Sequence, residues 1–108
     1  MIPDREHPVI VITGGSRGIG AATARLAAAK GYAVVISYLS KEAAARQVVE
    51  DVEQSGGKAL AVRADSSEPD AVMALFNTID DTFGRVDVLV NNAGIVDYPS
   101  RVEDIDPA

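Results

Sequence analysis

The chain has 108 residues, of which 47% are hydrophobic and 24% charged, so it is long enough to form one domain or part of one. It contains no cysteine, which excludes disulfides, thiol catalysis and cysteine-ligated zinc, and its residues suggest no other metal site. The net charge of −6, without any cluster of lysine and arginine, argues against a nucleic-acid partner. The sequence has neither an apolar run of roughly 20 residues nor a signal peptide, so we expect a cytoplasmic protein that does not bind membranes.

Four short apolar runs predict buried strands at residues 9–12, 33–37, 59–62 and 86–90. Helical patterns separate them. The first helix (18–30) is rich in alanine and ends at Gly31, Ser40 is expected to cap the second (40–54), and the third begins at Ser67 and ends at Gly84. The spacing of apolar residues predicts three core-facing sets, which are Ile19, Thr23, Leu26 and Ala27; Ala44, Ala45, Val48 and Val52; and Val72, Leu75, Phe76, Ile79 and Phe83.

Strands and helices alternate along the chain, which predicts an α/β fold with a doubly wound parallel sheet. The first two helices should cover one face and the third helix the other, which leaves the fourth strand as an open edge. We interpret residues 1–108 as a single partial domain, with a polar tail at 1–7 and a loop at 97–108 in which a further helix starts. Asp106 and Pro107 fit the cap and first turn of that helix, so the domain is expected to continue beyond this sequence.

A glycine-rich segment joins the first strand to the first helix. Gly14 permits a tight turn, Gly18 leaves room for an anion beside the backbone, and Gly20 allows the helix to pack closely on the strand. The N–H groups and the dipole at a helix N-terminus favour a phosphate. The alternative is a glycine-rich turn without a ligand, because glycine is also used in such turns for steric reasons alone.

Three motifs in order resemble the short-chain dehydrogenase/reductase family. Residues 13–20 (TGGSRGIG) match its TGxxxGxG motif, residues 91–94 (NNAG) match a second motif, and Asp65 follows the third strand, where the family has an Asp against adenine. The resemblance implies a Rossmann-type sheet that binds a nicotinamide dinucleotide. The cofactor-binding residues expected on this basis are Gly14, Ser16, Arg17, Gly18, Ile19, Gly20, Ser37, Tyr38, Asp65, Ser66, Asn92, Ala93 and Gly94.

Two of these predicted contacts have simpler alternatives. Asp65 can be an acid of the first helical turn or of a solvated loop, instead of an acceptor for the adenine amino group. Asn91 and Asn92 can be turn formers, as asparagine often is, instead of residues that bond to the backbone and leave space for a ribose.

NADP is favoured over NAD by the end of the second strand. An NAD site needs an acid there for the ribose hydroxyls, and the family's NAD users tend to carry Asp at the position of Tyr38. Arg17 supplies a cation for a 2′-phosphate, and Ser37, Ser40 or Lys41 can add donors. Leu39 departs from the NADP pattern, because many NADP users have Arg or Lys at this position.

The resemblance implies the interconversion of a carbonyl and an alcohol by hydride transfer, with a Tyr as acid and base and a Lys four residues later. No Tyr-x-x-x-Lys occurs in the sequence. We therefore expect the cofactor site here and the catalytic residues elsewhere, so that this chain alone is inactive. The family also implies a small-molecule carbonyl or alcohol substrate and a homo-oligomer.

Two other classes remain open. One is a nucleotide-binding or regulatory module that has no catalytic role. The other is an S-adenosylmethionine-dependent methyltransferase, which also has a glycine-rich loop after its first strand, although NNAG would then have no explanation.

Overall fold

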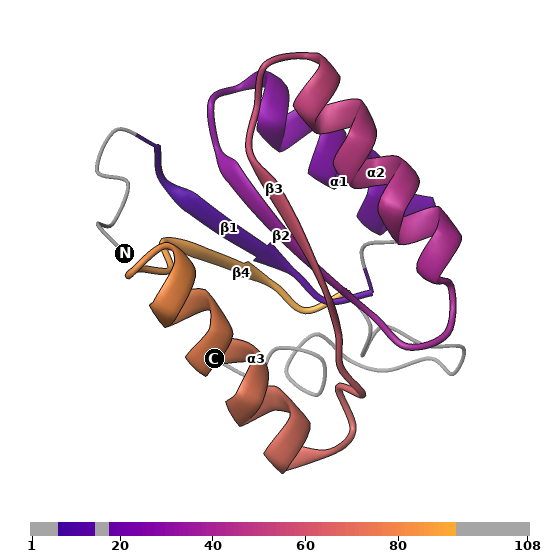
Figure 1. Ribbon diagram of the computed structural model, residues 1–108, viewed down its shortest axis with the longest axis vertical. Helices are drawn as coiled ribbons and strands as arrows, with labels where there is room; N and C mark the ends of the chain where they lie inside the picture. Colours follow the sequence, from indigo (N-terminus) through magenta and orange to yellow (C-terminus); the bar gives the residue numbers. More distant parts are fainter. Residues whose placement is uncertain (1–6, 15–17, 93–108) are drawn as a thin grey trace, which may run out of the picture.

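The computed structural model describes residues 7–14 and 18–92, which form a four-stranded parallel sheet with helices on both faces (Figure 1). The elements in chain order are β1 (Val9–Ile12), α1 (Gly18–Ala29), β2 (Ala33–Tyr38), α2 (Glu42–Gln54), β3 (Ala59–Arg63), α3 (Pro69–Thr82) and β4 (Val88–Val90). The strand order is β3-β2-β1-β4, and every neighbouring pair is parallel. The predicted doubly wound α/β fold is therefore confirmed, while the helix expected at Asp106 lies outside the described residues.

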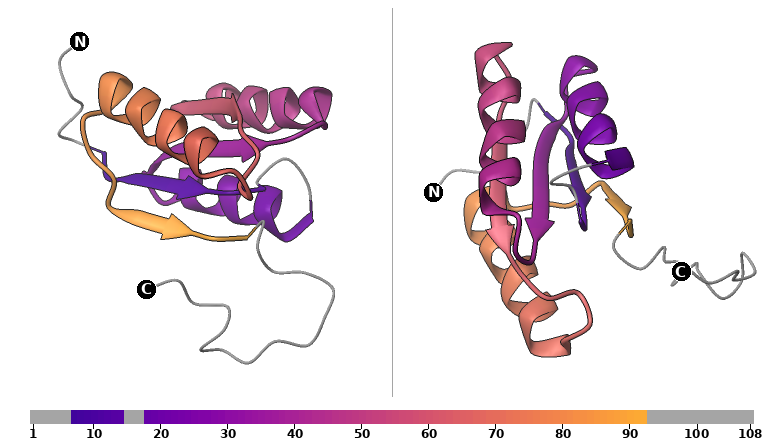
Figure 2. Two further views of the ribbon diagram at one scale, coloured as in Figure 1. Left: turned by 90° about the horizontal axis from the view of Figure 1, so that it is seen from below. Right: turned by 90° about the vertical axis from the view of Figure 1, so that its right-hand side faces the viewer.

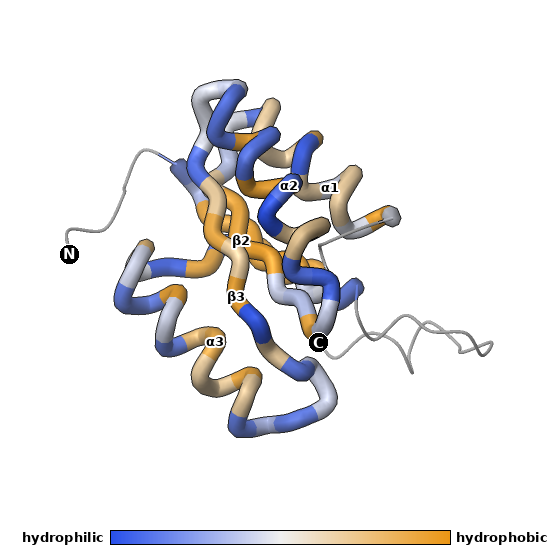
Figure 3. Tube along the Cα trace, turned by 45° about the vertical axis from the view of Figure 1, so that its right-hand side comes forward, coloured by the Kyte–Doolittle hydropathy of each residue, from blue (hydrophilic) through white to orange (hydrophobic). Residues whose placement is uncertain are grey.

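Side chains of β1 and β2 point alternately to two hydrophobic cores, as the period of two in a strand requires. One core combines the buried faces of α1 and α2 with Ile10, Ile12, Val34 and Ile36. The other combines α3 with Val9, Val11, Ala33 and Val35. Figure 1 shows α1 and α2 on one side of the sheet and α3 on the other, as predicted. Figure 3 shows the hydrophobic strands between the helices, with many hydrophilic positions on α2 and α3.

The predicted core face of α1 is wrong for its two large residues. Ile19 is 79% exposed and Leu26 is 60% exposed, while the residues buried on the sheet are Gly20, Ala21, Ala24 and Ala27. Small side chains let the helix approach the strands closely, and this contact replaces the burial of longer side chains. The predicted faces of α2 and α3 are confirmed by the burial of Val48, Val52, Leu75 and Ile79.

Two predicted helix caps are also wrong. Helix α2 begins at Glu42 after Lys41, so Ser40 is not the cap, and α3 begins at Pro69 after Glu68. The Ser67 hydroxyl donates to Asp65 instead, which removes it from the end of α3. The predicted helix ends are confirmed, because Gly31 and Gly84 both have positive φ.

No helix among the described residues combines the length and hydropathy needed to span a membrane.

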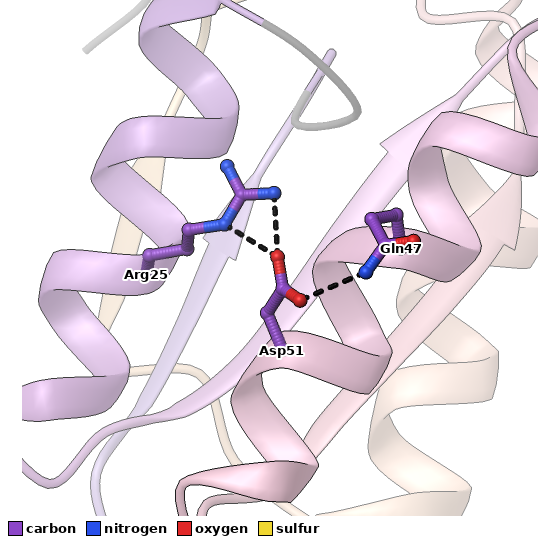
Figure 4. Close-up of polar contacts among 3 residues, drawn as sticks. All are labelled: Arg25, Gln47 and Asp51. Carbon is purple, nitrogen blue, oxygen red and sulfur yellow. Dashed lines mark hydrogen bonds and ion pairs between the residues drawn. The ribbon is translucent and has the colours of Figure 1, made fainter.

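A polar contact joins the two helices on one face of the sheet (Figure 4). Nε and Nη2 of Arg25 on α1 donate to Oδ2 of Asp51 on α2, at 2.9 and 2.8 Å. Gln47 donates to the other carboxylate oxygen at 2.9 Å. The hydrogen bonds from Gln47 and Arg25 lower the pKa of Asp51, so this carboxylate is ionised at neutral pH.

Strand β4 forms one edge of the sheet (Figure 2). Asp87, just before β4, forms hydrogen bonds to Val9 at the start of β1. The Asp87 N–H donates to the Val9 carbonyl at 2.9 Å, and the Val9 N–H donates to Oδ2 of Asp87 at 2.7 Å. Arg85 donates to Oδ1 at 2.6 Å. The hydrogen bond from Arg85, followed by that from Val9, lowers the pKa of Asp87.

This pair of contacts makes stability depend on the charge of Asp87. A carboxylate whose pKa is lower in the folded state stabilises the fold above its unfolded pKa of about 3.9, and that stabilisation is lost as pH falls through the folded pKa. We expect Asp87→Asn to lower the midpoint of thermal unfolding at pH 7, with a difference from the unaltered protein that shrinks below about pH 4. Glu53→Gln, an equal charge change on an exposed residue of α2, is the control. An Asp87→Asn difference that does not vary with pH would contradict this role.

Candidate functional site

The carboxyl ends of all four parallel strands lie at the same edge of the sheet, and the predicted site residues gather there. Gly14 follows β1, Tyr38 ends β2, Asp65 follows β3 and Asn92 follows β4. Ligands of doubly wound folds bind at this edge, at the point where the strand order reverses. Here the reversal falls between β1 and β4, next to Gly14.

Asn91 and Asn92 connect the end of β4 to the end of β1. The Thr13 hydroxyl donates to Oδ1 of Asn91 at 3.1 Å, and the Thr13 N–H donates to the Val90 carbonyl at 3.0 Å. Nδ2 of Asn92 donates to the Gly14 carbonyl at 3.0 Å. Both asparagines therefore contact the turn that follows β1, Asn91 through the Thr13 hydroxyl and Asn92 through the Gly14 carbonyl.

Gly14 is also held from the other side, by β2. Its N–H donates to Oγ of Ser37 at 3.2 Å. Gly14 has φ 68°, a left-handed conformation that glycine adopts without steric cost. Gly14 is thus held by Ser37 of β2 and by Asn92, which follows β4.

A cavity of about 220 Å³ lies beside this turn, and its lining residues are Gly14, Ser37, Tyr38, Leu39, Ala64, Asp65, Ser66 and Ser67. The Ala64 N–H donates to the Tyr38 carbonyl at 2.9 Å, which continues the β2–β3 pairing up to Asp65. The structure therefore brings five of the predicted site residues to one cavity, namely Gly14, Ser37, Tyr38, Asp65 and Ser66.

Asp65 is oriented by Ser67. The Ser67 hydroxyl and N–H donate to Oδ1 of Asp65 at 2.6 and 2.9 Å. These bonds, the hydroxyl first, lower the pKa of Asp65, so the carboxylate is charged at neutral pH. Both of these hydrogen bonds use Oδ1. Within residues 7–14 and 18–92 they leave Oδ2 of Asp65 able to accept from a ligand.

The beginning of α1 also lies at this edge. Gly18 is the first residue of α1 and has φ 61°. A Cβ at Gly18 would meet no heavy atom within 4 Å, so the space beside this residue is open. Ile19 is exposed, and Gly20 is buried between the helix and the sheet. The remaining predicted site residues, Ser16, Arg17, Ala93 and Gly94, lie outside the described residues.

Sequence reasoning missed three residues that line the cavity, Leu39, Ala64 and Ser67. The sequence indicates Leu39 only as a departure from a coenzyme pattern, and it predicts Ser67 as the start of a helix. A signal for Ser67 was present, because an aspartate two residues before a serine is typical of a turn closed by the carboxylate. Leu39 and Ala64 carry no such signal.

A larger hollow of about 400 Å³ lies elsewhere, between α2 and β3, where it is lined by Arg46, Val49, Glu50, Ala59, Leu60 and Ala61. Arg46 already pairs with Glu42 at 2.7 Å. This hollow lies along the outer edge of the sheet, away from the strand ends. It does not bring together polar groups from several strands, and we do not regard it as the functional site.

The chain is similar to known proteins over most of its length. A family model described as short chain dehydrogenase matches residues 8–108. The chain is 47% identical over 95 residues to 3beta-hydroxysteroid dehydrogenase 1 of Eggerthella lenta, covering 88% of this chain and 36% of that protein. It is 49% identical over 87 residues to a 3-oxoacyl-[acyl-carrier-protein] reductase of Synechocystis sp., covering 81% of this chain and 35% of that protein.

A solved structure is similar as well. A short chain dehydrogenase from Burkholderia cenocepacia J2315, in complex with NADP, has a TM-score of 0.79 and 41% sequence identity. The match covers 96% of this chain and 42% of that one, so the chain spans well under half the length of these proteins. The glycine turn, the asparagines after β4 and the acid after β3 therefore occur in a chain that belongs to the short-chain dehydrogenase family.

Proposed function

We propose that the protein containing this chain is an oxidoreductase that uses a nicotinamide dinucleotide to interconvert a carbonyl and an alcohol. The observation that carries the proposal is the cavity beside Gly14, at the carboxyl ends of the parallel strands. The carboxylate of Asp65, which Ser67 holds in place, lines this cavity. Two relatives are named as a hydroxysteroid dehydrogenase and an oxoacyl reductase, which supports hydroxy and oxo groups as the reacting functions. When bound, the nicotinamide ring gives or accepts the hydride.

The pyrophosphate is proposed to lie against the N-terminus of α1. The open space beside Gly18 and the unpaired N–H groups of a helix start suit an anion. Gly14, Gly18 and Gly20 would form the backbone there, with Ser16 and Ile19 as neighbours, and Asn92, Ala93 and Gly94 would border the ribose next to the nicotinamide.

The adenine is proposed to occupy the cavity between β2 and β3. Ser67 holds Oδ1 of Asp65, and Oδ2 would accept from the exocyclic amino group of adenine. The lowered pKa keeps the carboxylate ionised at neutral pH, so this hydrogen bond is charge-assisted. Ser66 would contribute a contact at the same wall.

NADP is the proposed coenzyme, ahead of NAD. Tyr38 ends β2 as a half-buried neutral residue, so this strand end offers no carboxylate to repel a 2′-phosphate. Arg17 would supply the positive charge. The Burkholderia neighbour in complex with NADP supports this choice.

The catalytic Tyr and Lys are proposed to come from another part of a longer protein, because this chain contains no Tyr-x-x-x-Lys. This chain alone would then bind coenzyme without turnover. A cytoplasmic location, a small-molecule substrate and a homo-oligomer stay predictions. A nucleotide-binding module without catalysis is the less favoured alternative, because the named relatives are a dehydrogenase and a reductase.

The pyrophosphate site predicts unequal effects of two similar glycine substitutions. Gly18 and Gly31 lie at opposite ends of α1, both have positive φ, and a Cβ at either would meet no atom within 4 Å. Alanine at either position should cost about 1–2 kcal/mol of folding stability. Only Gly18→Ala should raise the coenzyme Kd in the full-length protein, by about tenfold or more, because its methyl group would occupy the space proposed for the pyrophosphate. Equal Kd values for Gly18→Ala, Gly31→Ala and the unaltered protein would refute the site.

The adenine contact predicts discrimination between bases. The hypoxanthine analogue of the coenzyme has an oxygen in place of the amino group, which cannot donate to Asp65. We expect the unaltered protein to bind the adenine form at least about tenfold more tightly, as for a charge-assisted hydrogen bond. Asp65→Asn should reduce this ratio to near one in competition binding assays. A ratio that Asp65→Asn leaves unchanged would place the adenine elsewhere.

Coenzyme choice is testable at the end of β2. Tyr38→Asp introduces a carboxylate that repels a 2′-phosphate and accepts from ribose hydroxyls. We expect it to weaken NADP binding by about 10- to 100-fold and to leave NAD binding equal or stronger. Tyr38→Asn is the matched control, because asparagine has nearly the same shape as aspartate but carries no charge. Tighter binding of NAD than of NADP by the unaltered protein would contradict the proposed coenzyme.

A further inference from the structure

Both polar groups of Gly14 are held by side chains from different strands. The Gly14 N–H donates to Oγ of Ser37, near the end of β2, at 3.2 Å. The Gly14 carbonyl accepts from Nδ2 of Asn92, after β4, at 3.0 Å. Since β2 and β4 flank β1, the first residue of the glycine turn is fixed from both sides.

Ser37 is placed for this contact and not for one with a ligand. Its residue is only 1% exposed, although it borders the cavity. A buried hydroxyl is retained where it has a hydrogen-bond partner, and here that partner is the Gly14 N–H. Gly14 has φ 68°, and its N–H donates to Ser37 on the neighbouring strand β2.

We propose that Ser37 is a positioning residue that holds the glycine turn in its binding conformation, and that it does not contact the 2′-phosphate. This inference rests on the proposed coenzyme site. It assigns Ser37 a role different from the phosphate donor suggested by the sequence. A residue that orders the turn contributes to the binding of every dinucleotide, whereas a 2′-phosphate donor contributes to the binding of NADP alone.

The test compares coenzyme Kd values of Ser37→Ala with those of two other variants of the full-length protein. Ser37→Ala removes the acceptor and should raise the Kd of NADP and of NAD by the same factor, about 3- to 10-fold, as for the loss of one neutral hydrogen bond. Ser37→Thr keeps the hydroxyl and should restore most of the affinity. Val35→Ala, on the same strand and fully buried, should lower thermal stability without changing either Kd of the folded protein.

The outcomes are distinct. A loss confined to NADP would make Ser37 a 2′-phosphate ligand and overturn the inference. Unchanged Kd values in Ser37→Ala, with a stability loss like that of Val35→Ala, would reduce Ser37 to a structural residue and also overturn it. If Ser37→Thr does not fold, Ser37→Cys, a weaker acceptor of similar size, should lie between serine and alanine, and an affinity no better than that of alanine would count against the hydroxyl. Failure of the unaltered protein to bind either coenzyme would refute the proposed function itself.

Discussion

Strand β1 is buried on both faces and paired along both edges, and the arrangement of the functional site depends on it. Its four side chains are at most 6% exposed, and they divide between the two hydrophobic cores. Burying each side chain contributes about 1.5–3 kcal/mol, and any shift of the strand would also break its pairing with β2 and β4. The direction in which the chain leaves β1 at Thr13 is therefore fixed.

The polar residues just beyond β1 are held as a group. Thr13 and Ser37 are buried polar residues, and no buried side-chain nitrogen or oxygen within residues 7–14 and 18–92 lacks a hydrogen-bond partner. These hydrogen bonds join the ends of β1, β2 and β4, because Thr13 bonds to Asn91 and Gly14 bonds to both Ser37 and Asn92. Removal of one member leaves the others unsatisfied in a region of low dielectric, so the energetic effects of substitutions in this group should not be additive.

Helix α1 shows how packing near the site differs from a simple amphipathic pattern. Its buried face consists of Gly20 and alanines, and its two large apolar residues, Ile19 and Leu26, are exposed. Because the side chains on this face are small, the backbone of α1 packs close to the strands. This close approach places the N-terminus of α1, and the open space beside Gly18, next to the carboxyl end of β1.

The sequence by itself determined the alternation of strands and helices, the parallel sheet and the side of the sheet that each helix covers. Those features depend on hydrophobic periodicity and on the handedness of crossovers, which are local or nearly universal. The same topology allowed Gly14, Tyr38, Asp65 and Asn92 to be predicted at one edge, although residues 15–17 and 93–94 are outside the described part of the site.

The tertiary structure alone decided which of several available partners each polar side chain takes. Ser67 bonds to Asp65 and does not cap α3, and Ser37 bonds to Gly14, 23 positions away in the sequence. It also decided that α1 buries its small residues and exposes Ile19 and Leu26. A hydrogen bond or a packed face depends on distances between segments remote in the chain, and local sequence patterns do not encode these distances.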